Sequence, residues 1–250
     1  MLPVIILAII GGLIYGSFLN ALLWRLPEGK GMGGRSMCRS CGHILAWYDL
    51  FPVFSFIALG GKCRYCSKPI HIRYPIIEAS VGLMMGVFFA TQTMDLGLAR
   101  VMGIIGLLIL VTLFFFDLLY FILPDAVVFP GIIIFGVYDL LVLQNPLQFL
   151  AAAFLGAAFF GILYAVSKGS QLGFGDVKLA FLIGLMFGWP VGILAIILGI
   201  WYATAYAAIL LIMRKARLHD PIPLGAFLAL SGILSIIFSY ERLLPFILFH

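Results

Sequence analysis

The chain is organised around Gly173-Phe174-Gly175-Asp176, a stretch that opens an apolar run and places a carboxylate at its start. A second apolar run, from Val101 to Leu123, contains another carboxylate, Asp117, roughly one to two helical turns before its end. Ionisable groups inside membrane segments are rare, and they mark functional sites by default. We therefore take Asp117 and Asp176 as a candidate catalytic pair and ask whether the rest of the chain agrees.

Composition indicates the broad class. Of the 250 residues, 64% are hydrophobic and 10% are charged, and the mean hydropathy is +1.20. Soluble domains carry about 25% charged residues, so the chain is predicted to be a polytopic membrane protein. A net charge of +5 would suggest an acidic partner for a soluble protein. In a membrane protein the positive charges orient the molecule, so no nucleic-acid partner is expected.

The apolar runs predict an all-α polytopic membrane protein with about eight transmembrane helices, because crossing the ~30 Å hydrocarbon core takes about 20 residues. The run from Val177 to Met213 is nearly twice that length, so the Gly188-Trp189-Pro190 break predicts a hairpin rather than a kink. The expected helices cover residues 2–24, 75–91, 101–123, 126–143, 147–166, 177–188, 191–213 and 223–238.

The basic residues predict the orientation of these helices. No basic residue precedes the first run and several follow it, which indicates a retained helix with its N-terminus outside rather than a cleaved signal. With eight crossings, all of the 15 basic residues except Arg100 and Arg242 fall on the inner side. The same threading places Asp117, Asp125 and Asp176 at the cytoplasmic boundary.

Residues 25–74 form the long polar segment of the chain and contain all four cysteines, as the pairs Cys38/Cys41 and Cys63/Cys66. Two Cys-x-x-Cys pairs can close a tetrahedral four-thiolate zinc site, which leaves no position for water and is therefore structural. A cytosolic location keeps thiols reduced, which favours a zinc knuckle, while free thiols or disulfides stay the alternatives. We expect three parts: a first helix (1–24), this four-cysteine segment (25–74) and a helical membrane domain (75–250).

Other polar residues near the apolar runs each allow two interpretations. Asn20 shares a helix face with Ser17, and that face is expected to point at another helix or at the site. Glu78 either pairs with Arg73 at the membrane interface or supports the site. Asp125 is either a loop and helix-start residue or a direct participant.

The predicted positions of Asp117 and Asp176 allow the pair to act as a general acid and a general base. Gly173 and Gly175 predict a flexible loop that ends in Asp176 as the N-cap of a helix starting at Val177. An aspartate before a helix is usually only a cap. Asp117 is expected about 9 Å short of the inner end of its helix, at 1.5 Å per residue. Two carboxyl groups that meet cannot both ionise cheaply, so the pair would share a proton, as peptide hydrolysis by a general acid and a general base requires.

A proton-coupled transporter is the competing hypothesis, since it too would need intramembrane aspartates. Transporters bind near the bilayer midplane between repeated halves, whereas these aspartates are expected near one face and the chain shows no internal repeat. A membrane adaptor built on the cysteine segment would need no aspartate pair. A peptidase therefore explains more of the sequence than either alternative.

Along most of its length the chain resembles bacterial prepilin peptidases, also called type IV leader peptidases. Each motif that carries the resemblance is weak alone, but their order is specific. The motifs are Gly16-Ser17-Phe18-Leu19-Asn20 through Pro27, the two cysteine pairs around Ile44-Leu45-Ala46-Trp47-Tyr48-Asp49, Ile72 through Glu78, Asp117 through Leu123-Pro124-Asp125, Gly173 through Asp176-Val177-Lys178-Leu179, and Pro223 through Leu228.

This resemblance implies a GxGD-type aspartic membrane protease of the bacterial inner membrane. By motif match its catalytic aspartates are Asp117 and Asp176, supported by Gly173, Gly175 and Lys178. The family cleaves the leader of prepilins and pseudopilins for type IV pili and type II secretion on the cytoplasmic side. It then N-methylates the new N-terminus with S-adenosylmethionine as methyl donor. The residues suggest no site for that cofactor.

Overall fold

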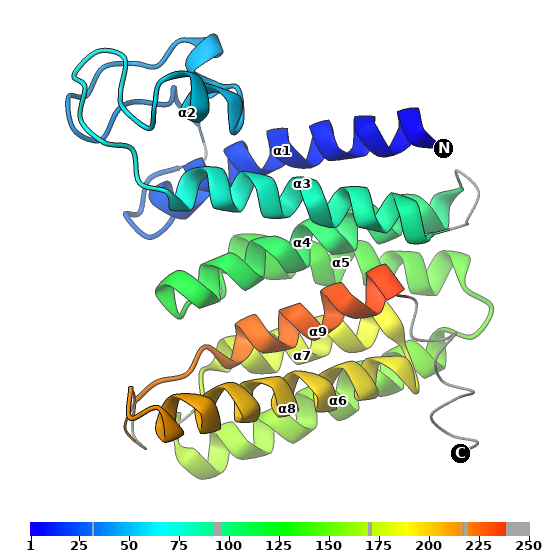
Figure 1. The fold of residues 1–250 in the computed structure, drawn as a ribbon. Helices are drawn as coiled ribbons and strands as arrows, with labels where there is room; N and C mark the ends of the chain where they lie inside the picture. Colours follow the sequence, from blue (N-terminus) through cyan, green and yellow to red (C-terminus); the bar gives the residue numbers. More distant parts are fainter. Residues whose placement is uncertain (32, 93–96, 170–171, 216, 218–219, 239–250) are drawn as a thin grey trace. The chain divides into compact units, whose positions relative to one another are not determined.

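The computed structural model describes residues 1–250 except 32, 93–96, 170–171, 216, 218–219 and 239–250. Over the described residues the chain is all-helical and has no β-strand, which confirms the predicted fold class (Figure 1). Arg242, one of the two basic residues expected outside, falls among the residues not described. The elements are α1 (Leu2–Arg25), η1 (Trp47–Leu50), α2 (Phe54–Ala58), α3 (Arg73–Thr91), α4 (Leu98–Tyr120), α5 (Asp125–Val142), α6 (Pro146–Ser167), α7 (Phe174–Phe187), α8 (Val191–Ile212) and α9 (Leu224–Phe238).

Each predicted apolar run corresponds to one helix, and the helices α1, α3, α4, α5, α6 and α8 are long and apolar enough to cross a membrane. The other two of the expected eight, α7 and α9, contain 14 and 15 described residues. Both are shorter than the about 20 residues that a straight crossing takes, so eight crossings stay a prediction. The hairpin predicted at Gly188-Trp189-Pro190 is confirmed, because α7 ends at Phe187 and α8 begins at Val191.

Helix α4 ends earlier than predicted. Its last residue is Tyr120, and Phe121 adopts a left-handed conformation (φ 56°) while its N–H bonds the carbonyl oxygen of Asp117 at 2.9 Å. Leu123 precedes Pro124, which disfavours a helical conformation at that position. Asp117 therefore lies in the last turn of α4, about 4.5 Å from its end along the axis, rather than about 9 Å.

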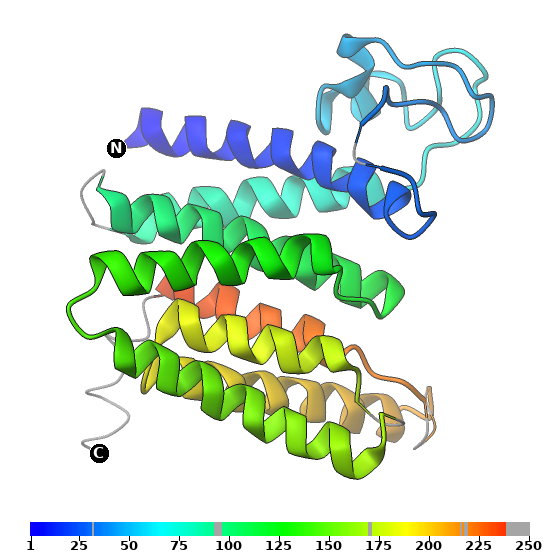
Figure 2. The ribbon, with the colours of Figure 1, turned by 180° about the vertical axis from the view of Figure 1, so that it is seen from behind.

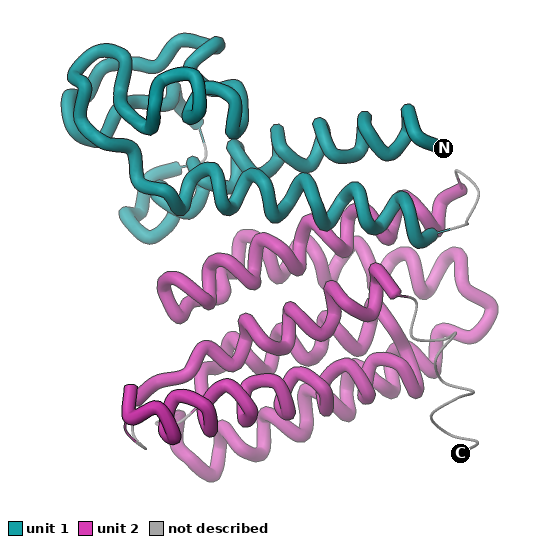
Figure 3. The backbone as a smooth tube through the Cα atoms, viewed as in Figure 1, with its two compact units in different colours: residues 1–93 teal, residues 94–250 magenta. Residues whose placement is uncertain are grey.

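The chain divides into two compact units, residues 1–93 and 94–250 (Figure 3). In unit 1, α1 and α3 lie side by side in opposite directions, as Figures 1 and 2 show from two sides. A Cβ added to Gly12 of α1 would lie 2.8 Å from the Cα of Gly82 of α3. The two backbones approach closely through small residues, as is common for helices packed in a membrane.

In unit 2, α7 is enclosed by neighbours, packing against α5, α6, α8 and α9. The closest approach is to α6, where a Cβ on Gly184 would lie 2.3 Å from backbone atoms of Ala153. Helix α9 packs against α4 and α8 as well. This packing brings together the end of α4, which carries Asp117, the start of α7, which carries Asp176, and the start of α9.

Candidate functional site

Asp117 is held by the start of a helix 109 residues further along the chain. Asp117 is only 6% exposed. Its Oδ2 accepts a hydrogen bond of 2.7 Å from the backbone N–H of Ala226. Ala226 is the third residue of α9. The first N–H groups of a helix lack partners within it, so the Asp117 carboxyl group satisfies one of them and is fixed in position by it.

Asp176 is also buried, at 9% exposure, but it is not the N-cap that the sequence suggested. Helix α7 begins at Phe174, and Gly173 is its N-cap in an extended conformation (φ −78°, ψ 145°). Asp176 is thus the third helical residue, in the first turn of α7, and its carboxyl group lies close to the backbone of Gly173. The positive end of the helix dipole favours a carboxylate at this place. The carboxyl group is therefore positioned at the start of its own helix.

Leu123 joins the two helix starts. A Cβ added to Gly175 would lie 3.1 Å from the Leu123 side chain, and one added to Gly225 would lie 3.0 Å from Leu123 Cδ1. The side chain thus packs against the starts of α7 and α9 together. The carboxyl groups of Asp117 and Asp176 are brought close enough for their charges to interact. The structure therefore unites two aspartates that are 59 positions apart by their residue numbers.

Lys178, the fifth residue of α7, forms an ion pair with Asp125, the first residue of α5. The Lys178 ammonium also lies 5.4 Å from the ring centroid of Phe129 and 5.7 Å from that of Phe174. The Asp125 side chain is 59% exposed, whereas that of Lys178 is 16% exposed. Asp125 therefore connects the starts of two helices beside the aspartate pair.

Asn20 and Glu78 belong to unit 1, whereas the two aspartates belong to unit 2. The Asn20 amide donates a hydrogen bond of 3.0 Å to the carbonyl oxygen of Tyr74, so its helix face points at α3 as expected. Glu78 accepts a hydrogen bond of 2.8 Å from the Val53 backbone N–H. The pairing of Glu78 with Arg73 that we considered is not among the ion pairs of the described residues.

The four cysteines Cys38, Cys41, Cys63 and Cys66 form a cluster in which all Sγ atoms lie within 4.8 Å of one another. The Sγ atoms of Cys38 and Cys66 are 3.9 Å apart. Tetrahedral zinc with Zn–S distances of about 2.3 Å separates its sulfur ligands by about 3.8 Å. The arrangement therefore fits a four-coordinate metal such as zinc after small movements of the thiols.

The two cysteine pairs sit in matching turns. The N–H of Cys38 bonds the carbonyl oxygen of His43, and the N–H of Cys63 bonds that of Lys68, both at 2.9 Å. The residue after each second cysteine adopts a left-handed conformation, with φ 71° at Gly42 and φ 56° at Ser67. A glycine is natural there, whereas a serine at such a position is strained.

Hydrogen bonds favour a thiolate at Cys38. Burial raises the pKa of this thiol, but the backbone groups of Cys41 and Ser40 and the thiols of Cys63 and Cys41 outweigh burial and lower it to about 7. Burial raises the pKa of the Cys63 thiol. Since metals bind thiolates, the cluster is poised to lose protons when it takes up a cation.

Asp49 braces the segment around the cysteines. Its Oδ1 accepts a hydrogen bond of 2.7 Å from Arg64, and its Oδ2 accepts one of 3.0 Å from the Tyr65 hydroxyl and one of 3.2 Å from the Ala46 N–H. Burial raises the pKa of Asp49, but the hydrogen bonds from Arg64, Tyr65 and Ala46 outweigh it and hold the pKa below its ordinary value. This carboxylate connects η1 to the second cysteine pair.

Sequence reasoning gave no individual role to Leu123, Gly225 and Ala226, although all three lie within motifs already noted. A signal was present. Pro223 stands just before an apolar run, which is typical of a helix start, and helix starts present free N–H groups that bind anions. The sequence alone does not indicate which of the chain's carboxylates reaches that start.

Comparisons with known proteins agree along most of the chain. Residues 10–92 match the Bacterial Peptidase A24 N-terminal domain, and residues 104–209 match the Type IV leader peptidase family. The prepilin leader peptidase/N-methyltransferase of Stutzerimonas stutzeri is 30% identical over 92% of this chain and 89% of its own length.

The protein of the same name from Pseudomonas aeruginosa is 28% identical over 95% of this chain and 91% of its own length. That of Myxococcus xanthus is 31% identical over 82% of this chain, which spans 62% of that longer relative. No solved structure matches the chain.

Proposed function

The chain belongs to the type IV leader peptidase family, and from this membership we infer that it cleaves the leader peptide of prepilins and then N-methylates the new N-terminus. It is a multi-pass inner-membrane protein. The relatives bear the name of a peptidase and methyltransferase rather than a transporter. A proton-coupled transporter is therefore not favoured.

Asp117 and Asp176 perform the cleavage in this proposal. Both are buried, they interact electrostatically, and both lie at helix ends in unit 2. Because two interacting buried carboxyl groups cannot both ionise cheaply, the pair holds one proton between them at neutral pH. The ionised carboxyl takes a proton from water as the water attacks the scissile carbonyl, and the protonated one donates a hydrogen bond to the carbonyl oxygen.

Rigid placement of the two carboxyl groups supports the role. Effective general acid and base groups must stand within hydrogen-bond reach of the proton they transfer. Asp117 is fixed by the Ala226 N–H, and Asp176 lies in the first turn of α7 beside the Gly173 backbone. Leu123 packs against both helix starts, so the peptide bond meets a preformed pair rather than two independent side chains.

The orientation and boundaries predicted from the sequence complete the proposal. The site faces the cytoplasm, because the basic residues of the chain concentrate on the side where the aspartates fall. Residues 75–250 supply the peptidase, with residues 1–24 and 25–74 as the first helix and the four-cysteine segment. The substrates are prepilins and pseudopilins, and membrane lipid surrounds the helices.

We assign zinc to the four-cysteine cluster. Its donor set is entirely sulfur, and four thiolates leave no open coordination position, so a bound zinc ion would stabilise the segment without taking part in hydrolysis. Cys38, Cys41, Cys63 and Cys66 would hold it. S-adenosylmethionine is the methyl donor implied by the methyltransferase activity.

The test uses the purified full-length protein in detergent with a prepilin, with and without S-adenosylmethionine. Mass spectrometry is expected to show a shortened pilin in both reactions, and a pilin heavier by one methyl group only when the donor is present. An intact prepilin after incubation with well-folded protein would overturn the proposal.

A further inference from the structure

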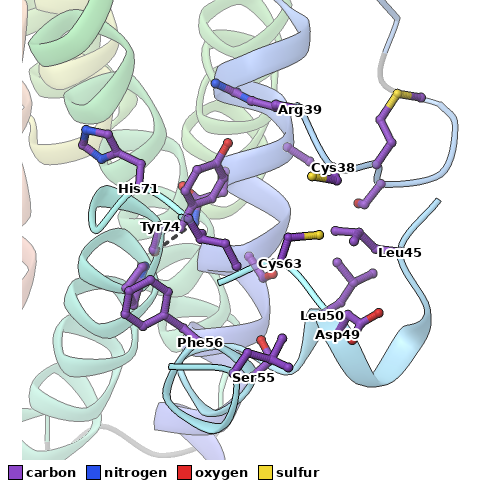
Figure 4. Close-up of a pocket in the computed structure, with 18 of the residues that line it drawn as sticks. Cys38, Arg39, Leu45, Asp49, Leu50, Ser55, Phe56, Cys63, His71 and Tyr74 are labelled. Atoms are coloured by element: carbon purple, nitrogen blue, oxygen red, sulfur yellow. Dashed lines mark hydrogen bonds between the residues drawn. The ribbon is translucent and has the colours of Figure 1, made fainter. Parts of the chain in front are cut away.

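A cavity of about 380 Å³ lies within unit 1, between α1, α3 and the segment that carries the cysteines (Figure 4). Pockets for small molecules measure about 300–1,000 Å³. All residues that line this cavity fall between Ser17 and Glu78, so residues 94–250, with Asp117 and Asp176, contribute none of its walls. Peptide cleavage as proposed above makes no use of it.

Flat apolar surfaces form part of the wall. Trp24 comes from α1, Phe56 from α2 and Tyr74 from α3, and Figure 4 shows Phe56 and Tyr74 among the lining side chains. Three rings from three separate helices surround one space. Aromatic faces of this kind stack on the flat ring of a nucleobase, whatever the base.

Positive charge is available at the same wall. The Arg39 guanidinium lies 5.3 Å from the ring centroid of Trp24 and 5.6 Å from that of Tyr74. In the part of the chain that the structure describes, ion pairs engage Lys30, Arg64 and Lys178, whereas the cavity-lining cations Arg39, Lys68 and Arg73 form no ion pair. Glu28 attracts Arg39 only from beyond ion-pair distance. Such cations can bind the carboxylate of a ligand through charge-assisted hydrogen bonds.

One buried carboxylate also lines the cavity. Glu78 is 8% exposed, and its Oε2 accepts the hydrogen bond of 2.8 Å from the Val53 backbone. Asp49, the other acidic residue of the wall, is occupied by Arg64, Tyr65 and Ala46. Ser17 and Asn20 also hydrogen-bond the Glu78 side chain, which fixes its position. Glu78 is therefore a fixed acidic group that favours a positively charged part of a ligand.

We propose that this cavity binds S-adenosylmethionine, which rests on the N-methyltransferase function proposed above. The ligand carries a flat adenine, a carboxylate, and a positively charged sulfonium and ammonium. These match the aromatic wall, the cations Arg39 and Arg73, and Glu78. The phosphate of an anionic lipid would pair with the cations alone, and would make no favourable contact with the aromatic rings or with Glu78.

The reaction at this site is balanced without a further reagent. The N-terminal amine of the cleaved pilin forms a bond to the methyl carbon, and the bond between that carbon and the sulfonium sulfur breaks. The products are the N-methylated pilin, S-adenosylhomocysteine and one proton released from the amine. Cleavage and methylation thus use different residues, drawn from unit 2 and unit 1 respectively.

Direct binding tests the site without relying on turnover. Equilibrium dialysis with radiolabelled S-adenosylmethionine is performed on the purified full-length protein in detergent. Arg39→Ala is expected to weaken binding by about tenfold or more, because it removes a charge-assisted hydrogen bond. Arg35→Ala is the matched control, since Arg35 lies in the same segment, is exposed and does not line the cavity. Asp176→Asn should bind as the wild type does.

Glu78→Gln provides a second, conservative variant. Its amide oxygen can still accept the Val53 N–H, so the segment keeps that contact, but the negative charge is gone; binding is again expected to fall by about tenfold. Should Arg39→Ala fail to fold, Lys68→Ala takes its place, with the exposed Lys62→Ala as control.

The outcomes separate the two proposals. If the wild type cleaves and methylates but Arg39→Ala and Glu78→Gln bind the donor normally, the cavity is not the donor site and the proposed function stands. If the wild type does not bind the donor, and retains phosphatidylglycerol that Arg39→Ala releases, the cavity is a lipid site and the inference is wrong. A wild type that neither cleaves nor methylates a prepilin overturns the proposed function itself.

Discussion

The backbone N–H of Ala226 donates a hydrogen bond of 2.7 Å to Oδ2 of Asp117, which is 109 residues earlier in the chain. The start of α9 thereby fixes the position of the buried Asp117 carboxyl group. Because reactions that depend on aligned groups lose about a hundredfold in rate when a group moves by about 1 Å, the residues at the start of α9 should matter to cleavage.

Gly225→Ala should lower the rate of leader cleavage by about tenfold to a hundredfold. The added methyl group would lie 3.1 Å from both Cγ and Oδ2 of Asp117 and 3.0 Å from Leu123 Cδ1, so the carboxyl group must shift. The measurement is the initial rate of prepilin cleavage in detergent. Gly136→Ala is the control, because its methyl group would meet only Leu185, at 4.0 Å; equal rates for the two variants would contradict the assigned role of α9.

Gly42 and Ser67, the two left-handed positions beside the cysteine pairs, predict opposite effects on stability when glycine is removed from one and introduced at the other. Gly42→Ala should destabilise the segment by about 1 kcal/mol, because a left-handed conformation costs other residues about 1–2 kcal/mol. No atom lies within 4 Å of the added Cβ, so the cost is purely conformational. Ser67→Gly should stabilise the segment by a similar amount. Thermal unfolding of the two variants measures both effects, and shifts of the same sign would refute the interpretation.

The Asp49 bonds predict a loss of stability in acid. Since the folded-state pKa of Asp49 lies below its ordinary value of 3.8, its contribution to stability is present above that value and is lost as pH falls through the folded-state pKa. Asp49→Asn should therefore unfold at a lower temperature than the wild type at pH 7, and the difference should shrink on acidification. The cysteines are common to both proteins, so their titration cancels. A gap that is unchanged down to the lowest accessible pH would argue against this role.

Metal analysis of the purified protein should find one zinc ion per chain. Cys41→Ser is expected to lose the metal and to unfold at a lower temperature, because the four thiolates would hold a structural ion. The rate of cleavage by the protein that stays folded should change little. Removal of zinc by a chelator should reproduce both effects. Metal-free protein with unchanged stability would rule out a structural zinc.

Much of the fold could be predicted because apolar runs of membrane length have few alternatives to a helix. The breaks were predictable too, since Gly188 and Pro190 interrupt a run too long for one crossing. The ends of helices were less well predicted. Phe121 ends α4 in a left-handed conformation that nothing in its side chain requires. Gly173, rather than Asp176 as predicted, is the N-cap of α7.

The aspartates themselves stood out because carboxylates are costly in apolar surroundings. The contacts that hold the aspartates in place could not be recognised in the sequence. The bond from Ala226 to Asp117 joins a backbone group to a side chain far away in sequence, and any residue type except proline could supply that N–H. The contact between Glu78 and Val53 is of the same kind, which is why an ion pair with Arg73 was considered instead.

The most direct measurement is leader cleavage by Asp117→Asn and Asp176→Asn, each compared with Asp125→Asn, which removes an exposed carboxylate beside the pair. Purified variants with wild-type unfolding temperatures are incubated with a prepilin, and the shortened product is quantified by mass spectrometry. Each of the first two variants should produce no detectable product, while Asp125→Asn should retain activity. Wild-type cleavage by either Asp117→Asn or Asp176→Asn would show that hydrolysis does not depend on this pair.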